Sequence, residues 1–293
     1  MNFYDCFMYY DEDLILDLRL NLLNKYIAKF VIVESCYTHS GKKRELKFDI
    51  KKYKNFQDKI IYIPIDTLPK EIEEIKTSDS KDQKNSKILN NSLARENYQR
   101  NQISFGLKNC NDNDLVIISD VDEIPNLESF KYKKKISIFK QKMFYYKFNL
   151  KHPTLTWVGS KACKKKDLIS PQSIRNIKSK IYPLWRLDVY FSKDKYFNLN
   201  FVDNGGWHFT NLKTPEDIHF KLSNFLHHHE YEESKTSLQD IKNLVKEKKI
   251  NYDHQADKKQ EKWKALISLT RASDSELPLY LIKNKEKYLK YFD

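Results

Sequence analysis

Four apolar runs of strand length recur in the first half of the chain, at residues 3–10, 28–35, 58–66 and 114–119. Continuous apolar runs of this length are typical of buried parallel strands. Residues 11–26 instead carry a helical pattern, with a broad apolar face opposite a polar one. Strands separated by helices predict an open, mostly parallel, Rossmann-like sheet of the α/β class, in which ligands bind at the carboxyl ends of the strands.

The remaining segments extend this picture. The polar, low-complexity segment Lys70–Asn91 predicts a mobile loop, and Ser92–Cys110 predicts a helix with Ser92 as its N-cap. Residues 136–150 and 181–202 are rich in aromatic and β-branched residues and predict added antiparallel strands. From Thr214 onward the pattern is mainly helical. We therefore expect one domain over residues 1–222, with a helical C-terminal extension, residues 223–293, packed on it.

One charged residue interrupts the apolar face of the first helix. Arg19 falls in the middle of that face. A buried guanidinium needs an acid or a phosphate as its partner. A structural ion pair is the simpler interpretation, ahead of a contact with substrate.

Charge favours an anionic partner. The formal net charge is +13, from 53 Lys and Arg against 40 Asp and Glu, which suits nucleic acid, a phospholipid surface or acidic substrates. The basic residues are dispersed, however, and no basic motif of a nucleic-acid-binding module appears, so nucleic acid is not expected as a partner. Peripheral association with a membrane face remains open.

The cysteines and the hydropathy indicate the compartment. Four cysteines occur without a CxxC pair, which argues against a cysteine zinc site and favours a reducing compartment. No signal segment opens the chain, and no apolar run approaches the roughly 18 residues that a membrane span requires. We expect a soluble, cytoplasmic protein, with the inner membrane face as an alternative location.

The strand at 114–119 ends in carboxylates, in the stretch "DLVIISDVDEIP". Alternation along an extended chain puts Asp120 and Asp122 on one side. Two carboxylates at a strand end suit a hard divalent cation such as Mn²⁺ or Mg²⁺, and such a cation can neutralise a diphosphate leaving group. An exposed turn is the alternative, because D-x-D triplets are common.

Several other residues could join such a site. His208, in "GGWHF", could add a ring nitrogen to the metal or be a hydrogen-bonded core residue. Arg95, Arg100 and Asn101 could bind a diphosphate or form ion pairs within the helix. The run His227–His229 cannot easily ligate one ion, because consecutive helical residues point about 100° apart, and a place at the substrate rim is favoured.

These pieces converge on a known family. The segments "FYDCFMYYDEDLILDLRLNLL", "FVIVESCYTHSGKKREL", "RENYQRNQISFGL", "DLVIISDVDEIP" and "GGWHFTNLKTPEDIHFKL" occur in that order. Together they closely resemble glycosyltransferase family 17, whose animal member adds the bisecting β-1,4 N-acetylglucosamine to N-glycans. The resemblance extends from Phe3 to about Leu222.

The resemblance implies a GT-A type fold, a UDP-sugar donor (UDP-N-acetylglucosamine in the first instance), a Mn²⁺-type metal and inversion at the anomeric carbon. Asp120 and Asp122 would form the metal and donor motif, with His208 as a further ligand. Around the nucleotide or the mouth of the site would lie a group from two segments: Glu34, Ser35, Thr38, His39, Ser40, Gly41, Arg95, Arg100 and Asn101. The animal enzymes carry an N-terminal anchor that this sequence lacks, which suggests a microbial or viral origin and an acceptor other than an N-glycan.

An inverting transfer also needs a general base near the acceptor hydroxyl. Candidates are Asp203, Glu230 and Glu123, and Asp203 ranks first because it adjoins the two glycines that lead to His208. Two other functions stay open from the residues alone: a basic nucleic-acid-binding protein, and a metal-dependent phosphohydrolase or nuclease. The acceptor, which the net charge suggests could be anionic, the exact linkage and the oligomeric state are not determined by the sequence.

Overall fold

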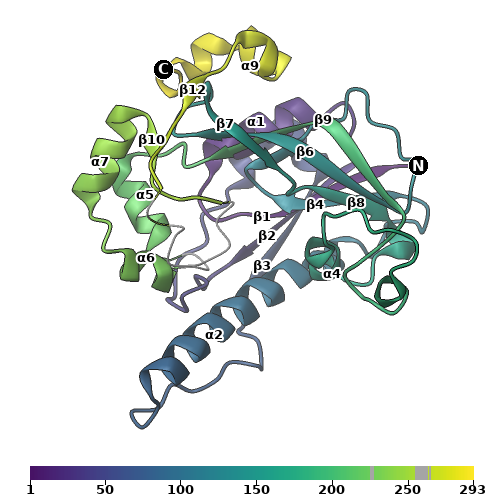
Figure 1. Cartoon of the computed structure of the whole chain (residues 1–293). Helices are drawn as coiled ribbons and strands as arrows, with labels where there is room; N and C mark the ends of the chain where they lie inside the picture. The colour runs from purple at the N-terminus through teal and green to yellow at the C-terminus, as the bar shows by residue number, and fades with distance from the viewer. Residues whose placement is uncertain (225–227, 255–262, 264) are drawn as a thin grey trace.

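A ten-stranded sheet runs through the centre of the molecule, with helices on both sides (Figure 1). The computed structural model describes residues 1–224, 228–254, 263 and 265–293. Four parallel strands form the core of the sheet in the order β4-β1-β2-β3: β1 (Phe3–Met8), β2 (Lys29–Ser35), β3 (Ile60–Ile65) and β4 (Leu115–Asp120). The predicted Rossmann-like α/β class, with a mostly parallel central sheet core, is thereby confirmed.

Shorter and antiparallel strands extend this core. They are β5 (Glu123–Pro125), β6 (Ile136–Tyr145), β7 (Leu150–Trp157), β8 (Lys161–Lys164), β9 (Leu199–Thr210) and β12 (Thr270–Arg271). Strand β8 joins β4 to β6 through antiparallel pairing on both sides, whereas β6 and β9 run parallel. The pair β10 (Lys249–Ile250) and β11 (Ile267–Ser268) forms a separate two-stranded sheet.

Side-chain alternation along the parallel strands builds two apolar layers. Phe30 and Ile32 of β2 belong to a layer that includes residues of α1 (Asp13–Leu23) and α9 (Leu279–Lys283). Val31 and Val33 face a layer that includes residues of α3 (Ile103–Gly106) and α4 (Pro171–Asn176). A third cluster joins β6 to α5 (Pro215–Leu222), α6 (His228–Ser234) and α7 (Leu238–Glu247).

The helix before β4 begins earlier than the sequence pattern predicts. Helix α2 covers Lys81–Asn101 and projects from the body as a long rod (Figure 1). Ser80 and Gln83 form a reciprocal capping box, which satisfies the first backbone amides of the helix. The expected loop over Lys70–Asn91 is therefore helical in its second half, and Ser92 lies inside the helix, where its hydroxyl donates to the Ile88 carbonyl.

The aromatic segment 181–202 also differs from expectation. Only its last four residues are in a strand, the start of β9, and the rest is an irregular loop with one short helical turn, Leu187–Val189. The composition predicts strand residues here, but many of the apolar side chains are exposed.

The C-terminal part is attached to the main sheet. It contains the expected helices, including α5, which starts with Thr214 as N-cap. It also contributes short strands, and β12 pairs with β7 at the edge of the ten-stranded sheet. Within the described residues, none of the helices combines the length and the apolar character that crossing a bilayer would require.

Candidate active site

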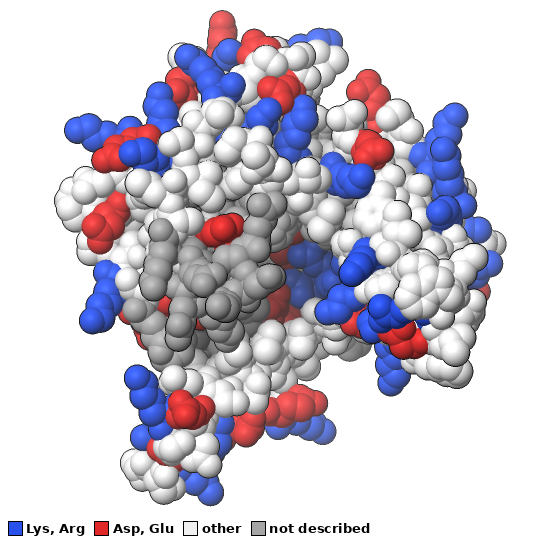
Figure 2. Space-filling model, in the orientation of Figure 1, with Lys and Arg blue, Asp and Glu red and all other residues white. Residues whose placement is uncertain are grey.

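The acidic turn lies where β4 ends. Met8 of β1 pairs with Asp120 of β4 and with Val33 of β2, so the carboxyl ends of these three strands meet at one edge of the sheet. A cavity of about 600 Å³ opens there, and Asp120, Asp122 and Glu123 are among its lining residues. Figure 2 shows acidic and basic atoms deep in a hollow on this face. Parallel α/β sheets bind ligands at this edge.

A buried arginine fixes the turn from the other side of the sheet. Arg19 of α1 forms a two-armed ion pair with Asp5, with distances of 2.6 and 2.7 Å. Its Nη1 also donates to the carbonyls of Asp120, Val121 and Glu123 at 2.9–3.0 Å. The predicted structural ion pair of Arg19 is confirmed, and the same guanidinium sets the backbone path of the acidic turn.

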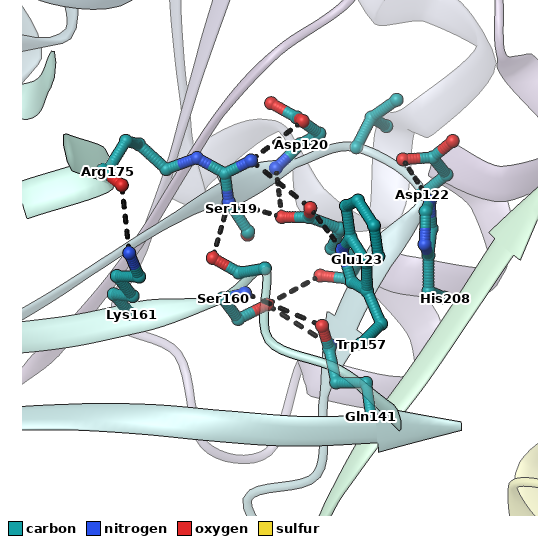
Figure 3. A network of polar contacts seen from close by, with 12 residues as sticks. Ser119, Asp120, Asp122, Glu123, Gln141, Trp157, Ser160, Lys161, Arg175 and His208 are labelled. Carbon is teal, nitrogen blue, oxygen red and sulfur yellow. Dashed lines mark hydrogen bonds and ion pairs between the residues drawn. The ribbon is translucent and has the colours of Figure 1, made fainter. Parts of the chain in front are cut away.

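Two further arginines, Arg175 and Arg100, hold Asp120 from the cavity side, and Figure 3 shows the first of them. Arg175 Nη2 lies 2.9 Å from Oδ2 of Asp120, and Arg100 Nη2 lies 3.0 Å from Oδ1. Burial by itself would raise the pKa of Asp120, but the charges of the two arginines outweigh burial and hold that pKa well below its usual range. Asp120 is thus an ionised anchor for two cations.

Glu123 is the second anchor of Arg175. Its Oε2 accepts from Arg175 Nη1 at 2.6 Å and from the Asp120 amide at 2.9 Å, and its Oε1 accepts from the indole of Trp157 at 2.7 Å. A Cβ on Gly159 would lie 2.0 Å from that Oε1, so only glycine fits beside it. With both oxygens engaged, Glu123 is placed to position Arg175 rather than to accept a proton from an acceptor hydroxyl.

The C-terminal end of α4 is also tied to this network. Lys161 donates to the carbonyls of Arg175 and Ile177, at 2.8 and 2.5 Å. Burial, with a smaller effect from the neighbouring Arg175, lowers the pKa of Lys161 to about 7. Helix α4, and with it the guanidinium of Arg175, is therefore fixed against β8.

Asp122 faces a different pair of side chains. Its Oδ1 lies 3.5 Å from Nε2 of His208, and its Oδ2 lies 3.8 Å from Nζ of Lys221. Burial acts to raise the pKa of Asp122, but the opposing effects of His208 and then Lys221 are larger in sum. The pKa is therefore below its usual value, and the carboxylate is ionised. Antiparallel pairing of β5 with β9 brings His208 opposite Glu123 and so next to Asp122.

The donor set beside Asp122 fits a divalent cation in part. Among the described residues, no three His, Cys, Asp or Glu side chains converge as a complete metal cluster. Asp122 and His208 nonetheless present one oxygen and one nitrogen to the same space, and Nδ1 of His208 is buried without a hydrogen-bond partner in the described part of the chain. Two protein ligands suffice where a substrate diphosphate and water complete the coordination, as is common for Mg²⁺ sites. Asp120, whose oxygens are held by arginines, is the predicted ligand that does not fit.

Some residues predicted to bind the nucleotide support the framework instead. Glu34 is fully buried and accepts from Arg44, from the amides of Lys47 and Phe48 and from Tyr62, so it organises the segment after β2 and does not line the cavity. Asn101 accepts from the amide of Gln172 near the start of α4.

Arg95 supports the neighbouring loop. It donates to the His39 carbonyl at 3.0 Å, and a Cβ on Gly41, whose φ is +96°, would meet the Arg95 guanidinium at 2.7 Å. Ser40 hydrogen-bonds to Thr38, and neither Ser40 nor Gly41 lines the cavity. These residues shape the mouth of the cavity from behind.

Other predicted residues do reach the cavity. Ser35, Thr38, His39 and Arg100 line it together with the acidic turn. Burial lowers the pKa of His39, whose ring contacts Gln99 at 3.3 Å and so lies against α2. The segment after β2 and the helix before β4 therefore contribute to one wall, as the sequence order suggested.

The candidate bases are distributed differently. Asp203 is 80% exposed, pairs with Lys140 at 2.8 Å and is not among the lining residues, so the structure does not bring the first-ranked base to the site. Glu230 lies on α6, and its charge adds to the effect of burial in raising the pKa of Tyr252, which lines the cavity. His227 lies outside the described residues, as do the side chains of His228 and His229.

Sequence reasoning missed several lining residues of the charged end. Arg175 and Trp157 come from segments without a recognised motif, and Lys221 ends the segment "GGWHFTNLKTPEDIHFKL" without having been singled out. Only the fold brings the three to the acidic turn. Glu12 follows β1, and its Oε2 accepts from the amides of Tyr10 and Asp11. Its position just after a parallel strand was a signal that could have identified it.

Aromatic side chains form the other end of the cavity. Trp157 lies against the His208 ring, with centroids 4.8 Å apart. Tyr252 and Trp263 form an edge-to-face pair with centroids 4.8 Å apart, and both line the cavity. The cavity thus combines a charged end at the strand termini with an aromatic end under the C-terminal helices, a division typical of sites for an amphipathic ligand.

A parallel sheet with an ionised acidic turn, paired arginines and an adjoining cavity defines a ligand-binding α/β protein whose site combines anions and cations. The family model of glycosyltransferase family 17 matches residues 1–166, more than half of the 293 residues. The chain therefore belongs to glycosyltransferase family 17 and is a glycosyltransferase, which implies a sugar donor and a glycan acceptor. Comparison with curated proteins gave no match.

Proposed function

We propose that this glycosyltransferase has a GT-A type fold and moves N-acetylglucosamine from UDP-N-acetylglucosamine to a glycan hydroxyl, with inversion and in β-1,4 linkage. The observation that carries the proposal is the facing pair of Asp122 and His208 at the end of β4. When bound there, Mn²⁺ or Mg²⁺ would neutralise charge on the departing diphosphate. The family resemblance supports the choice of UDP and of the sugar.

The residues of the charged end would then have three different roles. Asp122 and His208 would hold the cation. Arg100, Arg175 and Lys221 supply positive charge along the wall, and an arginine fork suits phosphate oxygens. Asp120 and Glu123 keep the two arginines in place, so that positive charge meets the diphosphate without rearrangement.

The aromatic end suits the acceptor. Trp157, Tyr252 and Trp263 line this end of the cavity, and the apolar face of a sugar ring packs well on aromatic side chains. The net charge of +13 favours an anionic glycan.

For the general base we propose Glu12, with Glu230 as the alternative. Glu12 lines the cavity near Lys221, and its Oε1 accepts no hydrogen bond from the described residues. Glu230 lies near Tyr252 at the aromatic end. A base needs only to reach the acceptor hydroxyl on the side away from the diphosphate.

Transfer from UDP-N-acetylglucosamine to a panel of neutral and acidic glycans tests this proposal, with the anomeric configuration of the product read by NMR. We expect a β-linked product that requires Mn²⁺ or Mg²⁺. Glu12→Gln should lower turnover by about 100-fold or more while keeping donor affinity, because it removes only proton transfer. An α-linked product would contradict inversion, and full activity of both Glu12→Gln and Glu230→Gln would contradict the assignment of the base.

A further inference from the structure

An exposed apolar loop follows helix α4. Six of its large side chains are exposed, with Phe191 at 89% and Trp185 at 75%. The exposed set is Ile181, Leu184, Trp185, Leu187, Tyr190 and Phe191. So many exposed large apolar side chains on one short segment indicate an interaction surface, because surface apolar residues that need no explanation are scattered singly.

The loop has a defined shape. The Lys178 amide donates to the Asp194 carbonyl at 2.7 Å, which closes its base. Tyr182 and Val189 are buried, and backbone hydrogen bonds form the turn around Arg186. The outward direction of the apolar side chains is therefore a property of the folded loop.

Basic residues surround the apolar side chains. Residues 178–195 contain five Lys or Arg and two acids, a net charge of +3. One of the acids, Asp188, is neutralised by Arg186 at 2.6 Å and by Lys195 at 2.7 Å. The loop lies at the lower right of Figure 1, where Figure 2 shows uncharged atoms bordered by Lys and Arg side chains.

This combination identifies the partner by its chemistry. Protein interfaces are depleted in lysine at their cores. Membrane-surface elements instead join Trp, Phe and Leu to a ring of Lys and Arg, because the rings enter the headgroup region while the cations contact anionic lipids. We propose that residues 178–195 form a membrane-binding loop, here called the docking loop, that inserts Trp185 and Phe191 into the surface of an anionic bilayer.

Co-sedimentation of the full chain with lipid vesicles tests the proposal. Wild-type protein should bind vesicles containing phosphatidylglycerol at least about tenfold more strongly than vesicles of phosphatidylcholine alone, and salt should weaken binding. Trp185→Ser with Phe191→Ser should lower the binding by about tenfold or more, since it removes the inserted area. The matched control, Phe105→Ser with Leu289→Ser, removes exposed apolar side chains elsewhere and should bind like the wild type.

Fluorescence gives an independent readout. The emission of the wild type should shift to the blue on anionic vesicles, and Trp185→Phe should abolish that shift while binding persists. Three results would overturn the proposal: no preference for anionic vesicles, equal binding by the Trp185→Ser, Phe191→Ser variant, or absence of vesicle binding together with a dimer in sedimentation velocity that this variant abolishes. The last result would identify the loop as a contact between two copies of the chain.

Discussion

Arg175, which the sequence did not single out, is a central residue of the site. It bridges the carboxylates of Asp120 and Glu123, and its own pKa is raised by them against the effect of burial. The positive charge beside the acidic turn therefore depends on a short helix, α4, that is distant in sequence.

Replacing Arg175 by Gln should destabilise the protein by about 3–5 kcal/mol, because it leaves the buried Glu123 carboxylate without its cation. Donor affinity should fall as well. Urea unfolding and donor titration measure the two effects. Arg186→Gln removes an arginine whose ion pair with Asp188 is exposed and should leave the stability close to that of the wild type. Equal stability of Arg175→Gln and wild type would contradict the role given to Arg175.

The sequence identified the acidic turn but not the side of the sheet that each residue faces. Glu34 and Asp120 both end parallel strands, so both were expected at the nucleotide. Glu34 shares the side of Phe30 and Ile32, away from the cavity, whereas Asp120 shares the side of Ile118, toward α4. The two sides could not be distinguished before the positions of the helices were known.

At the scale of elements, α1 and the turn after β4 behave as one unit. Arg19 reaches from α1 to three carbonyls of the turn. This arrangement connects the first helix of the chain to the site, although Arg19 itself does not line the cavity.

Arg19→Met should lower the free energy of unfolding by about 3–5 kcal/mol, since Asp5 is then buried without its partner. The double variant with Asp5→Leu should recover part of that loss, and a double-mutant cycle gives the coupling between the two. The double variant should still bind the sugar donor more weakly than the wild type, because the carbonyls of the turn have lost the guanidinium that donates hydrogen bonds to them. Donor affinity equal to that of the wild type would show that Arg19 does not position the turn.

Helices and strands were predictable to different extents. The parallel strands are long, continuous apolar runs, and their positions agree with the sequence pattern. Helix α2 was placed too late because its first half has no apolar face, and only the Ser80 and Gln83 capping box marks its start. The loop at 181–198 has the composition of a strand but exposes its apolar side chains, so composition alone gave the wrong element.

At the scale of the whole molecule, side-chain contacts attach the C-terminal segment to the main sheet. Glu276 accepts from Lys151 on β7 at 2.5 Å and from Lys142 on β6 at 3.3 Å, and its carbonyl accepts from the Trp207 indole on β9. One short helical turn is thereby attached to three strands of the sheet.

This attachment predicts an acid-sensitive contribution to stability. The hydrogen bond from Lys151, with help from Lys142, lowers the pKa of Glu276 to about 2 from its usual 4.5. Because the folded state lowers this pKa, the contribution is complete above pH 4.5 and is lost as the pH falls toward 2. Glu276→Gln should cost about 1–2 kcal/mol at neutral pH. Urea unfolding over the acid range should show the gap to wild type closing; a gap that stays constant would contradict the ion pair.

The central claim is that Asp122 and His208 bind a divalent cation that holds the donor diphosphate. Calorimetric titration of UDP-N-acetylglucosamine, in Mn²⁺ and in EDTA, tests it most directly. We predict Mn²⁺-dependent binding to the wild type and to the exposed-site control Asp203→Asn, and binding weakened by about tenfold or more in Asp122→Asn. Equal affinity in EDTA, or unchanged affinity in Asp122→Asn, would contradict the claim and leave the arginines and Lys221 as the groups that bind the diphosphate.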